Sequence, residues 1–141
     1  MITIEVRGLP APQGSKRHVG HGIMVESSRA VGPWREAVRA ETQRVMQDHF
    51  QLKGPVSLVA TFRLYRPKSH YRTGRNAGQV RETAPRHPSG KPDLDKLQRA
   101  LLDGLTEGGA WVDDCQVVRL FSAKEYGLPG CRIDITGLEE I

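Results

Sequence analysis

The stretch from residue 91 to residue 120 constrains the fold of this chain more than any other part of it. Leucines recur there at helical intervals, so the pattern predicts an amphipathic helix over residues 93–106. Asp93 stands where a helix N-cap belongs, and Gly108 begins a glycine pair that is typical of a helix end. The residues that follow, 116–126, have the pattern of a strand.

Two pairs of aspartates flank the predicted helix. Asp93 and Asp95 open it, and Asp113 and Asp114 follow its glycine turn. Residues two apart on a helix point to nearly opposite sides, so Asp93 and Asp95 can share a ligand only if Asp93 precedes the helix proper. Hard cations such as Mg²⁺ bind oxygen ligands, usually one or a few carboxylates with water and substrate phosphates. The spacing therefore indicates a divalent-metal site, provided that the turn folds the second pair back onto the helix N-terminus.

Each acidic element also has a purely structural interpretation. An aspartate at a helix N-terminus caps the helix and suits its dipole. Asp95, Arg99 and Asp103 line one polar face at i, i+4 and i+8, where solvated ion pairs are common. An Asp-Asp pair before a strand is often only a turn. Their occurrence together, beside a strongly basic segment, favours the metal site.

The same residues resemble the signature of the RusA-type Holliday junction resolvases, metal-dependent endonucleases of bacteria and their phages. In that family an Asp-x-Asp-Asn sequence opens a helix, a lysine follows one turn later, and an Asp-Asp pair precedes a Gln-Val-Val strand. This chain has Asp-Leu-Asp at 93–95 and Asp-Asp-Cys-Gln-Val-Val at 113–118. The close resemblance covers the stretch 91–120, with a looser one in the order of elements along the chain.

Two positions depart from the family pattern. Lys96 stands where the family usually has asparagine, and Arg99 stands where it usually has the lysine that assists catalysis. Because arginine stays protonated at any working pH, residue 99 is not expected to donate a proton. Either Arg99, or Lys96 in its place, is expected to stabilise negative charge on the phosphate.

The resemblance implies a Mg²⁺-dependent endonuclease, with Mn²⁺ as a substitute ion, that resolves four-way DNA junctions by paired symmetric nicks in recombination and repair. It also implies a homodimer, since a two-fold protein matches a two-fold substrate that is cut twice. The implied setting is the cytoplasm of a bacterial cell or of a phage-infected bacterium. The implied catalytic residues are Asp93, Asp95, Lys96, Arg99 and Asp114, and the implied ligands of one or two metals are Asp93, Asp95 and Asp114, with Asp113 as a further candidate.

Positive charge is concentrated in residues 66–91. This segment has no apolar periodicity, and it carries seven lysines and arginines against one acid, a local charge of +6 compared with +5 for the whole chain. We expect a mobile arm that binds DNA backbone through phosphate contacts and counterion release, and so selects DNA by shape. The alternative is a solvated surface loop without a DNA contact. The same two interpretations, a phosphate contact or a solvated loop, apply to Lys16 and Arg17. The expected DNA contacts are Lys16, Arg17, Arg66, Lys68, Arg72, Arg75, Arg81, Arg86 and Lys91.

The remaining pattern predicts a single α+β domain over residues 1–141, with one mixed β-sheet packed by two helices on one face. No segment approaches the ~20 apolar residues of a membrane span, and no signal peptide is visible. The two cysteines lack zinc-site spacing and are expected to be reduced. The expected elements are strands at 2–6 and 56–65, a short strand or hairpin arm at 20–25, a helix at 33–48, and a last strand at 131–135 that forms an antiparallel hairpin with 116–126.

Two other functions fit parts of this pattern. A DNA-binding module of the same fold that has lost catalysis is consistent with the changes at Lys96 and Arg99; it would bind junctions without needing Asp95. A Mg²⁺ phosphohydrolase of small phosphate esters fits the carboxylates but has no use for a basic arm. A haloacid-dehalogenase-type phosphatase is disfavoured, because the polar residues 89–92, rather than an apolar strand, precede Asp93.

Overall fold

The computed structural model describes residues 1–14, 16–18, 24–26 and 29–138. Its main sheet has four strands in the order β1-β6-β4-β5. Strands β1 (Ile2–Arg7) and β4 (Val56–Leu64) both run antiparallel to β6 (Gly130–Gly137), and β4 runs parallel to β5 (Val117–Tyr126). The predicted α+β architecture with one mixed sheet is confirmed, and β1 and β5 form the two edges of that sheet.

The antiparallel hairpin predicted for the last two strands is wrong. β5 and β6 are consecutive along the chain, but β4 lies between them. The turn after β5 crosses the end of β4, where Gly127 donates a main-chain hydrogen bond of 3.0 Å to Leu64. Strand β4 buries all its alternating apolar residues and takes a partner on each edge. The alternation shows that a strand has a buried face, but it does not show which strands lie beside it.

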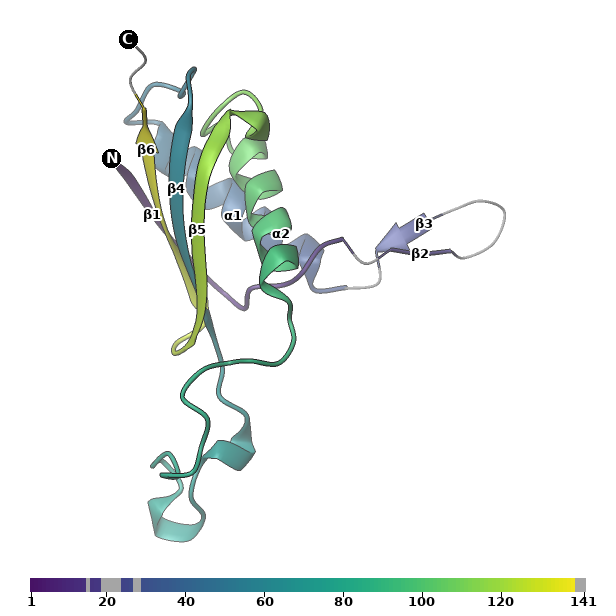
Figure 1. Cartoon of the computed structure of the whole chain (residues 1–141), viewed down its shortest axis with the longest axis vertical. Helices are drawn as coiled ribbons and strands as arrows, with labels where there is room; N and C mark the ends of the chain where they lie inside the picture. Colours follow the sequence, from purple (N-terminus) through teal and green to yellow (C-terminus); the bar gives the residue numbers. More distant parts are fainter. Residues whose placement is uncertain (15, 19–23, 27–28, 139–141) are drawn as a thin grey trace.

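Two helices cover one face of the sheet (Figure 1). Helix α1 (Val31–Met46) and helix α2 (Leu94–Glu107) begin within two residues of the predicted positions. They pack closely where α2 has a glycine: a Cβ on Gly104 would lie 2.7 Å from Cγ1 of Val38. Neither described helix has the length and apolar character that crossing a membrane requires.

The core lies between the helices and the sheet. The leucine spacing that predicted α2 places Leu97, Leu101 and Leu105 in this core, where they are fully buried. Trp34, expected in the core rather than at a binding surface, is 2% exposed. Their partners are the inward residues of the strands, which include Ile4, Leu58, Phe62, Ile133 and Ile135.

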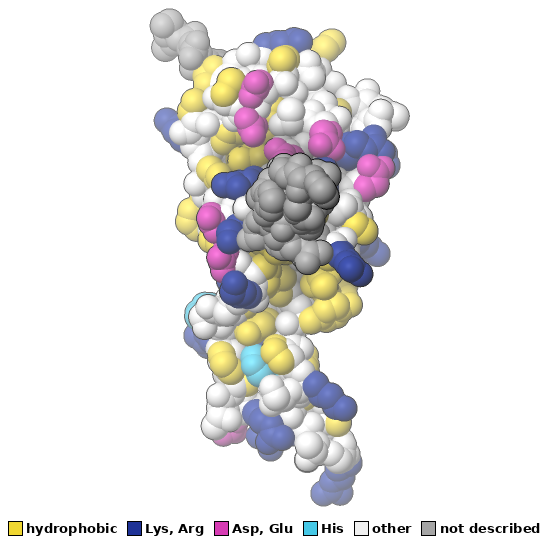
Figure 2. All heavy atoms as spheres, turned by 90° about the vertical axis from the view of Figure 1, so that its right-hand side faces the viewer, with side chains coloured by type: hydrophobic (Ala, Val, Ile, Leu, Met, Phe, Trp, Pro, Cys, Tyr) yellow, Lys and Arg dark blue, Asp and Glu magenta, His cyan; other side chains and the backbone are white. Residues whose placement is uncertain are grey.

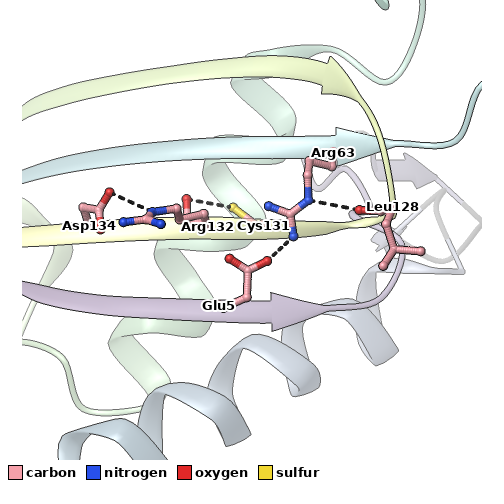
Figure 3. A network of polar contacts seen from close by, with 6 residues as sticks. All are labelled: Glu5, Arg63, Leu128, Cys131, Arg132 and Asp134. Carbon is pink, nitrogen blue, oxygen red and sulfur yellow. Dashed lines mark hydrogen bonds and ion pairs between the residues drawn. The ribbon is translucent and has the colours of Figure 1, made fainter.

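The other face of the sheet is mainly polar, with Val59 and Phe121 as exposed apolar residues, and has no helix over it in the described part of the chain. Arg63 on β4 reaches across β6 to pair with Glu5 on β1 (Figure 3). This path is open because β6 has Gly130 on the same rung, where a Cβ would fall 2.7 Å from Nη2 of Arg63. Arg132 and Asp134 form a further pair along β6, at 3.3 Å.

The segment between β4 and α2, residues 66–91, projects from the body as an arm (Figure 1). An antiparallel bridge joins Tyr71 to Val80, so the two limbs of the arm are partly paired. The absence of apolar periodicity therefore did not mean an absence of structure. Two short 3-10 helices stand on the arm, η1 (Lys68–His70) and η2 (Gly74–Asn76).

A separate two-stranded antiparallel sheet pairs β2 (Lys16–His18) with β3 (Met24–Glu26). The strand or hairpin arm expected at 20–25 is thus seen in part, since residues 19–23 lie outside the described residues. The side chains of residues 15–28 are also outside them, and these include the predicted contacts Lys16 and Arg17.

Candidate metal and nucleic-acid site

Asp93 and Asp95 stand together at the start of α2. Asp93 is the N-cap residue, as predicted, with an extended backbone (φ −68°, ψ 139°) and no capping hydrogen bond from its side chain. Nζ of Lys96 lies 3.7 Å from Oδ2 of Asp93. Asp95 lies in the first turn, and both aspartates are exposed. Two carboxylates are therefore open to solvent at the end of α2 where the helix dipole favours negative charge.

Asp113 and Asp114 lie beyond the opposite end of α2. Asp113 caps the 3-10 helix η3 (Asp114–Gln116): its Oδ1 accepts a 3.0 Å hydrogen bond from the main-chain N–H of Cys115, while its own N–H donates to Oε1 of Gln116 at 3.1 Å. The bond from Cys115 holds the pKa of Asp113 below its ordinary value. Asp113 and Gln116 therefore form a capping box, so part of the Asp-Asp-Cys-Gln pattern is structural.

Asp114 belongs to a local acidic group. Burial raises the pKa of Asp114, and its pKa is raised further by the hydrogen bond that its protonated form donates to Asp113 and by the charges of Asp113 and Asp103. Asp103 lies eight residues after Asp95 on the same helix, which corresponds to about 12 Å along its axis. The neighbours of Asp114 are therefore at the end of α2, rather than at its start.

Within one chain the turn does not bring the second acidic pair back to the helix N-terminus. Helix α2 and strand β5 run in opposite directions, because Gln98 in the first half of the helix donates a hydrogen bond to Ser122 in the second half of the strand. Among the described residues, no three Asp, Glu, His or Cys side chains are placed to hold one metal ion. The assignment of Asp93, Asp95 and Asp114 as ligands stays a prediction, and one chain alone does not gather all three.

The segment after β1 lies against the cations of α2. The N–H of Gln13 donates a 3.0 Å hydrogen bond to the main-chain carbonyl of Lys96. A Cβ on Gly14 would fall 2.5 Å from Nη1 of Arg99, so the guanidinium lies close to the Gly14 backbone. Gly14 has φ +118°, a conformation that favours glycine. Residues 13–14 therefore contact the main chain of Lys96 and the guanidinium of Arg99.

Gln13 also joins the two helices. Its amide nitrogen donates a hydrogen bond to Oδ2 of Asp103, and its Oε1 accepts one of 2.8 Å from Arg35 on α1. The sequence interpretation used the Gln-Gly-Ser-Lys-Arg loop only for its cations. In the sequence, the Gln13-Gly14 pair was the available signal that the chain here contacts α2.

Lys124 is a further residue near the site that the sequence interpretation did not single out. Its Nζ donates hydrogen bonds of 2.7 Å to the carbonyl of Gly90 and 2.9 Å to the carbonyl of Pro92. These two residues lead directly into Asp93. Lys124 pairs in register with the buried Phe62 of β4, so it lies on the helix-covered face of the sheet. A lysine on the inward alternation of a strand was the signal that could have found it.

The predicted DNA-contacting cations of the arm are exposed, with one exception. Figure 2 shows lysine and arginine side chains gathered on the arm, while most carboxylates lie on the body. Arg66 is the exception: its guanidinium lies 4.5 Å from the ring centroid of Tyr126 and donates a 2.8 Å hydrogen bond to the carbonyl of Pro85. Arg66 thus ties the two limbs of the arm to β5. The exposed cations are Lys68, Arg72, Arg75, Arg81, Arg86 and Lys91.

Known proteins similar to this chain are endodeoxyribonucleases. The model of the family Endodeoxyribonuclease RusA matches residues 6–136. The crossover junction endodeoxyribonucleases RusA of Escherichia coli (strain K12), Shigella sonnei (strain Ss046) and Enterobacteria phage 82 are each 46% identical to this chain over 44 residues. That stretch covers 31% of this chain and 37% of each relative. Because the family model spans nearly the whole described chain, the protein belongs to the RusA endodeoxyribonuclease family.

Proposed function

We propose that this protein is a Mg²⁺-dependent endodeoxyribonuclease that resolves four-way DNA junctions by paired symmetric nicks during recombination and repair. One observation carries the proposal: the exposed basic arm ends at Lys91, two residues before the exposed carboxylate of Asp93. A DNA backbone bound along the arm would thus reach the carboxylates. We assign the activity to the cytoplasm of a bacterial or phage-infected cell, in keeping with the bacterial and phage relatives.

Asp93 and Asp95 are suited to hold the metal. Both are exposed carboxylates, and Asp93 does not use its side chain to cap α2. Mg²⁺ needs only one or two protein carboxylates when water and phosphate oxygens complete its coordination, and Mn²⁺ accepts the same ligands. When bound, such an ion lowers the pKa of a water molecule and neutralises charge on the phosphate oxygens.

Arg99 and Lys96 are the two cations of α2, and both stand within four residues of Asp95. Arg99 lies against Gly14, and Lys96 pairs with Asp93. A guanidinium held in place can stabilise charge that develops on the phosphate without reorganising during the reaction. The permanent charge of arginine suits charge stabilisation but excludes proton donation. Arg99 can therefore stabilise charge as a lysine would, but it cannot act as a proton donor.

A homodimer would complete the acidic site. β5 is an edge strand of ten residues with Val118 59% and Phe121 65% exposed, and no strand pairs with its outer edge in the described part of the chain. If two copies pair these edges antiparallel, their α2 helices run in opposite directions. The start of α2 from one copy then faces the end of α2 from the other, so that Asp95 and the partner's Asp114 serve one site. Two such sites match two cuts in a two-fold junction.

The test is a gel assay on a labelled immobile four-way junction with Mg²⁺, with Mn²⁺ and with EDTA. Wild type should give paired nicks only with metal. Asp95→Asn should cut nothing yet bind the junction as tightly or more tightly, because a negative charge near phosphate is removed. The matched control Asp48→Asn changes an exposed aspartate after the end of α1 and should cut like wild type.

Two outcomes would contradict the proposal. Tight junction binding by wild type without cleavage under any metal would favour a DNA-binding module of the same fold, with Lys96 and Arg99 as the residues to revert. Loss of junction binding by a folded Asp95→Asn variant would contradict the metal role of Asp95.

A further inference from the structure

A cleft of about 750 Å³ lies at the root of the arm, apart from the acidic pairs. Its walls come from three segments: the outgoing limb of the arm, the returning limb at Arg86 and His87, and the end of β5. The volume falls within the roughly 300–1,000 Å³ that is usual for small-ligand pockets. Because both limbs of the arm and the end of β5 line this cleft, its shape depends on how the arm joins the body.

The cleft collects the aromatic residues best suited to stacking. The chain has three tyrosines, and all three, Tyr65, Tyr71 and Tyr126, line this one cleft. Tyr65 is 65% exposed and Tyr71 is half-buried, so neither ring is packed in the hydrophobic core. Tyrosines on a protein surface offer flat apolar faces at little entropic cost, which is how proteins hold unpaired bases.

The far wall of the cleft is fixed before any ligand arrives. Tyr126 is held by the guanidinium of Arg66 at 4.5 Å and by an edge-to-face contact with His70 at 5.4 Å between ring centroids. Arg66 is in turn bonded to the carbonyl of Pro85 on the returning limb. Arg66 thus connects the two limbs with the end of β5 and holds the aromatic wall of the cleft in one position.

Charge around the cleft favours a ligand that carries phosphate. Arg86 and Lys124 line it, with Glu125 as a single acid. Lys124 also binds the carbonyls of Gly90 and Pro92, so one side chain contacts both the cleft and the segment that leads into Asp93. A nucleotide in the cleft would therefore have its neighbouring phosphates beside the carboxylates of α2.

We propose that this arm-root cleft binds one unstacked base of a DNA strand, next to the position of the cut. The inference rests on the proposed function for its choice of DNA as the ligand. Tyr71 and Tyr65 stack on the base, Arg86 and Lys124 contact its phosphates, and Arg66 holds the wall. Enzymes and binding proteins that take a base out of the stack select DNA in which that base is already poorly paired, as it is at a branch point.

The experiment measures binding and base capture in EDTA, where cleavage does not occur. Four-way junctions carry 2-aminopurine at one position at a time around the branch point, and its fluorescence reports unstacking. Wild type should change the fluorescence at one position. Tyr71→Ala should remove that change and weaken junction binding by about tenfold to a hundredfold, the usual effect of losing one aromatic stacking partner. Tyr71→Phe keeps the ring and should behave like wild type.

Controls separate stacking from folding and from charge. Phe50→Ala removes an aromatic that is 97% exposed far from the cleft and should change nothing. Tyr65→Ala, at a mostly exposed position, should weaken base capture while leaving the melting temperature unchanged. Binding to a fully paired duplex should stay within about twofold of wild type for both tyrosine variants, because backbone contacts are kept.

Each result bears on one proposal or on both. Junction binding and fluorescence unchanged in Tyr71→Ala and Tyr65→Ala would overturn the cleft inference, and Mg²⁺-dependent cleavage by the same variants would leave the nuclease proposal standing. Tyrosine-dependent base capture by a protein that cuts no junction would support the cleft and overturn the nuclease proposal. A protein that binds no DNA would overturn both.

Discussion

Nζ of Lys124 donates a hydrogen bond of 2.9 Å to the main-chain carbonyl of Pro92, the residue before Asp93. A second bond of 2.7 Å reaches the carbonyl of Gly90. On the same face of β5, two residues earlier, Ser122 accepts a hydrogen bond from Gln98 of α2. Strand β5 therefore holds both the helix and the segment that leads into it, and the position of Asp93 depends on the sheet.

Lys124→Met keeps most of the side-chain length but removes both hydrogen bonds. We expect the single-turnover cleavage rate to fall at least about tenfold, because small misplacements of catalytic groups are costly. Junction affinity should fall much less, since Lys124 is one cation among many. Lys124→Arg keeps donors at this position and should recover part of the rate. Wild-type cleavage by Lys124→Met would show that these bonds do not position Asp93.

Gly104→Ala and Gly32→Ala make the same change in the two helices and should have opposite effects. At Gly104 a Cβ would lie 2.7 Å from Val38 and 3.2 Å from the carbonyl oxygen of Arg35, so we expect a loss of about 1–3 kcal/mol. At Gly32 nothing lies within 4 Å, and alanine should stabilise the protein by about 0.4–1 kcal/mol. Urea unfolding measures both free energies. Equal stability of the two variants would contradict the close approach of α1 and α2.

Cys115 and Cys131 should react with a thiol reagent at very different rates. Both are free, but Cys115 is exposed and Cys131 is buried, and burial raises the pKa of the Cys131 thiol. Because the thiolate is the reacting form, native protein should label at one thiol, and the second should react only as the protein unfolds. Cys115→Ser should abolish the fast phase. Two equally fast thiols in native protein would contradict the packing of β6.

The helices and strands could be predicted from the local sequence pattern, but the strands that lie beside one another in the sheet could not. The start of α2 could be predicted within one residue, because leucine spacing and the cap at Asp93 act over a few residues. β4 lies between β5 and β6, so both of its edges are hydrogen-bonded to other strands. Which strand takes this central position depends on the assembly of the whole sheet, and local sequence does not determine it. A short turn between two strands therefore suggested a hairpin that the sheet does not contain.

The same distinction applies to the candidate site. Asp95 and Asp114 are close in sequence, yet the rigid length of α2 lies between them. The role of Lys124 could not be predicted from the sequence, because its partners are main-chain carbonyls and every residue has one. Arg66 was counted only as a charge, although an aromatic ring and a carbonyl hold it in place. Charges and motifs can be read from sequence, whereas the partners of each side chain cannot.

Arg75 and Arg66 are both arginines of the basic arm, but they should affect DNA binding in different ways. Arg75→Gln removes an exposed charge from η2, so the slope of log affinity against log salt should become shallower by about 0.9, the value for one phosphate contact. Arg66→Gln removes the contacts with Tyr126 and Pro85. Its loss of affinity should be larger and should persist at high salt, because the arm loses its orientation as well as a charge.

The measurement is junction affinity in EDTA across a range of salt concentrations. Arg44→Gln is the control, because Arg44 is 69% exposed on α1, outside the arm, and its slope should match wild type. An unchanged slope for Arg75→Gln would make the tip of the arm a solvated loop without a DNA contact. Identical losses for Arg66→Gln and Arg75→Gln at every salt concentration would show that Arg66 acts as one more charge, and that the arm does not depend on Tyr126 for its orientation.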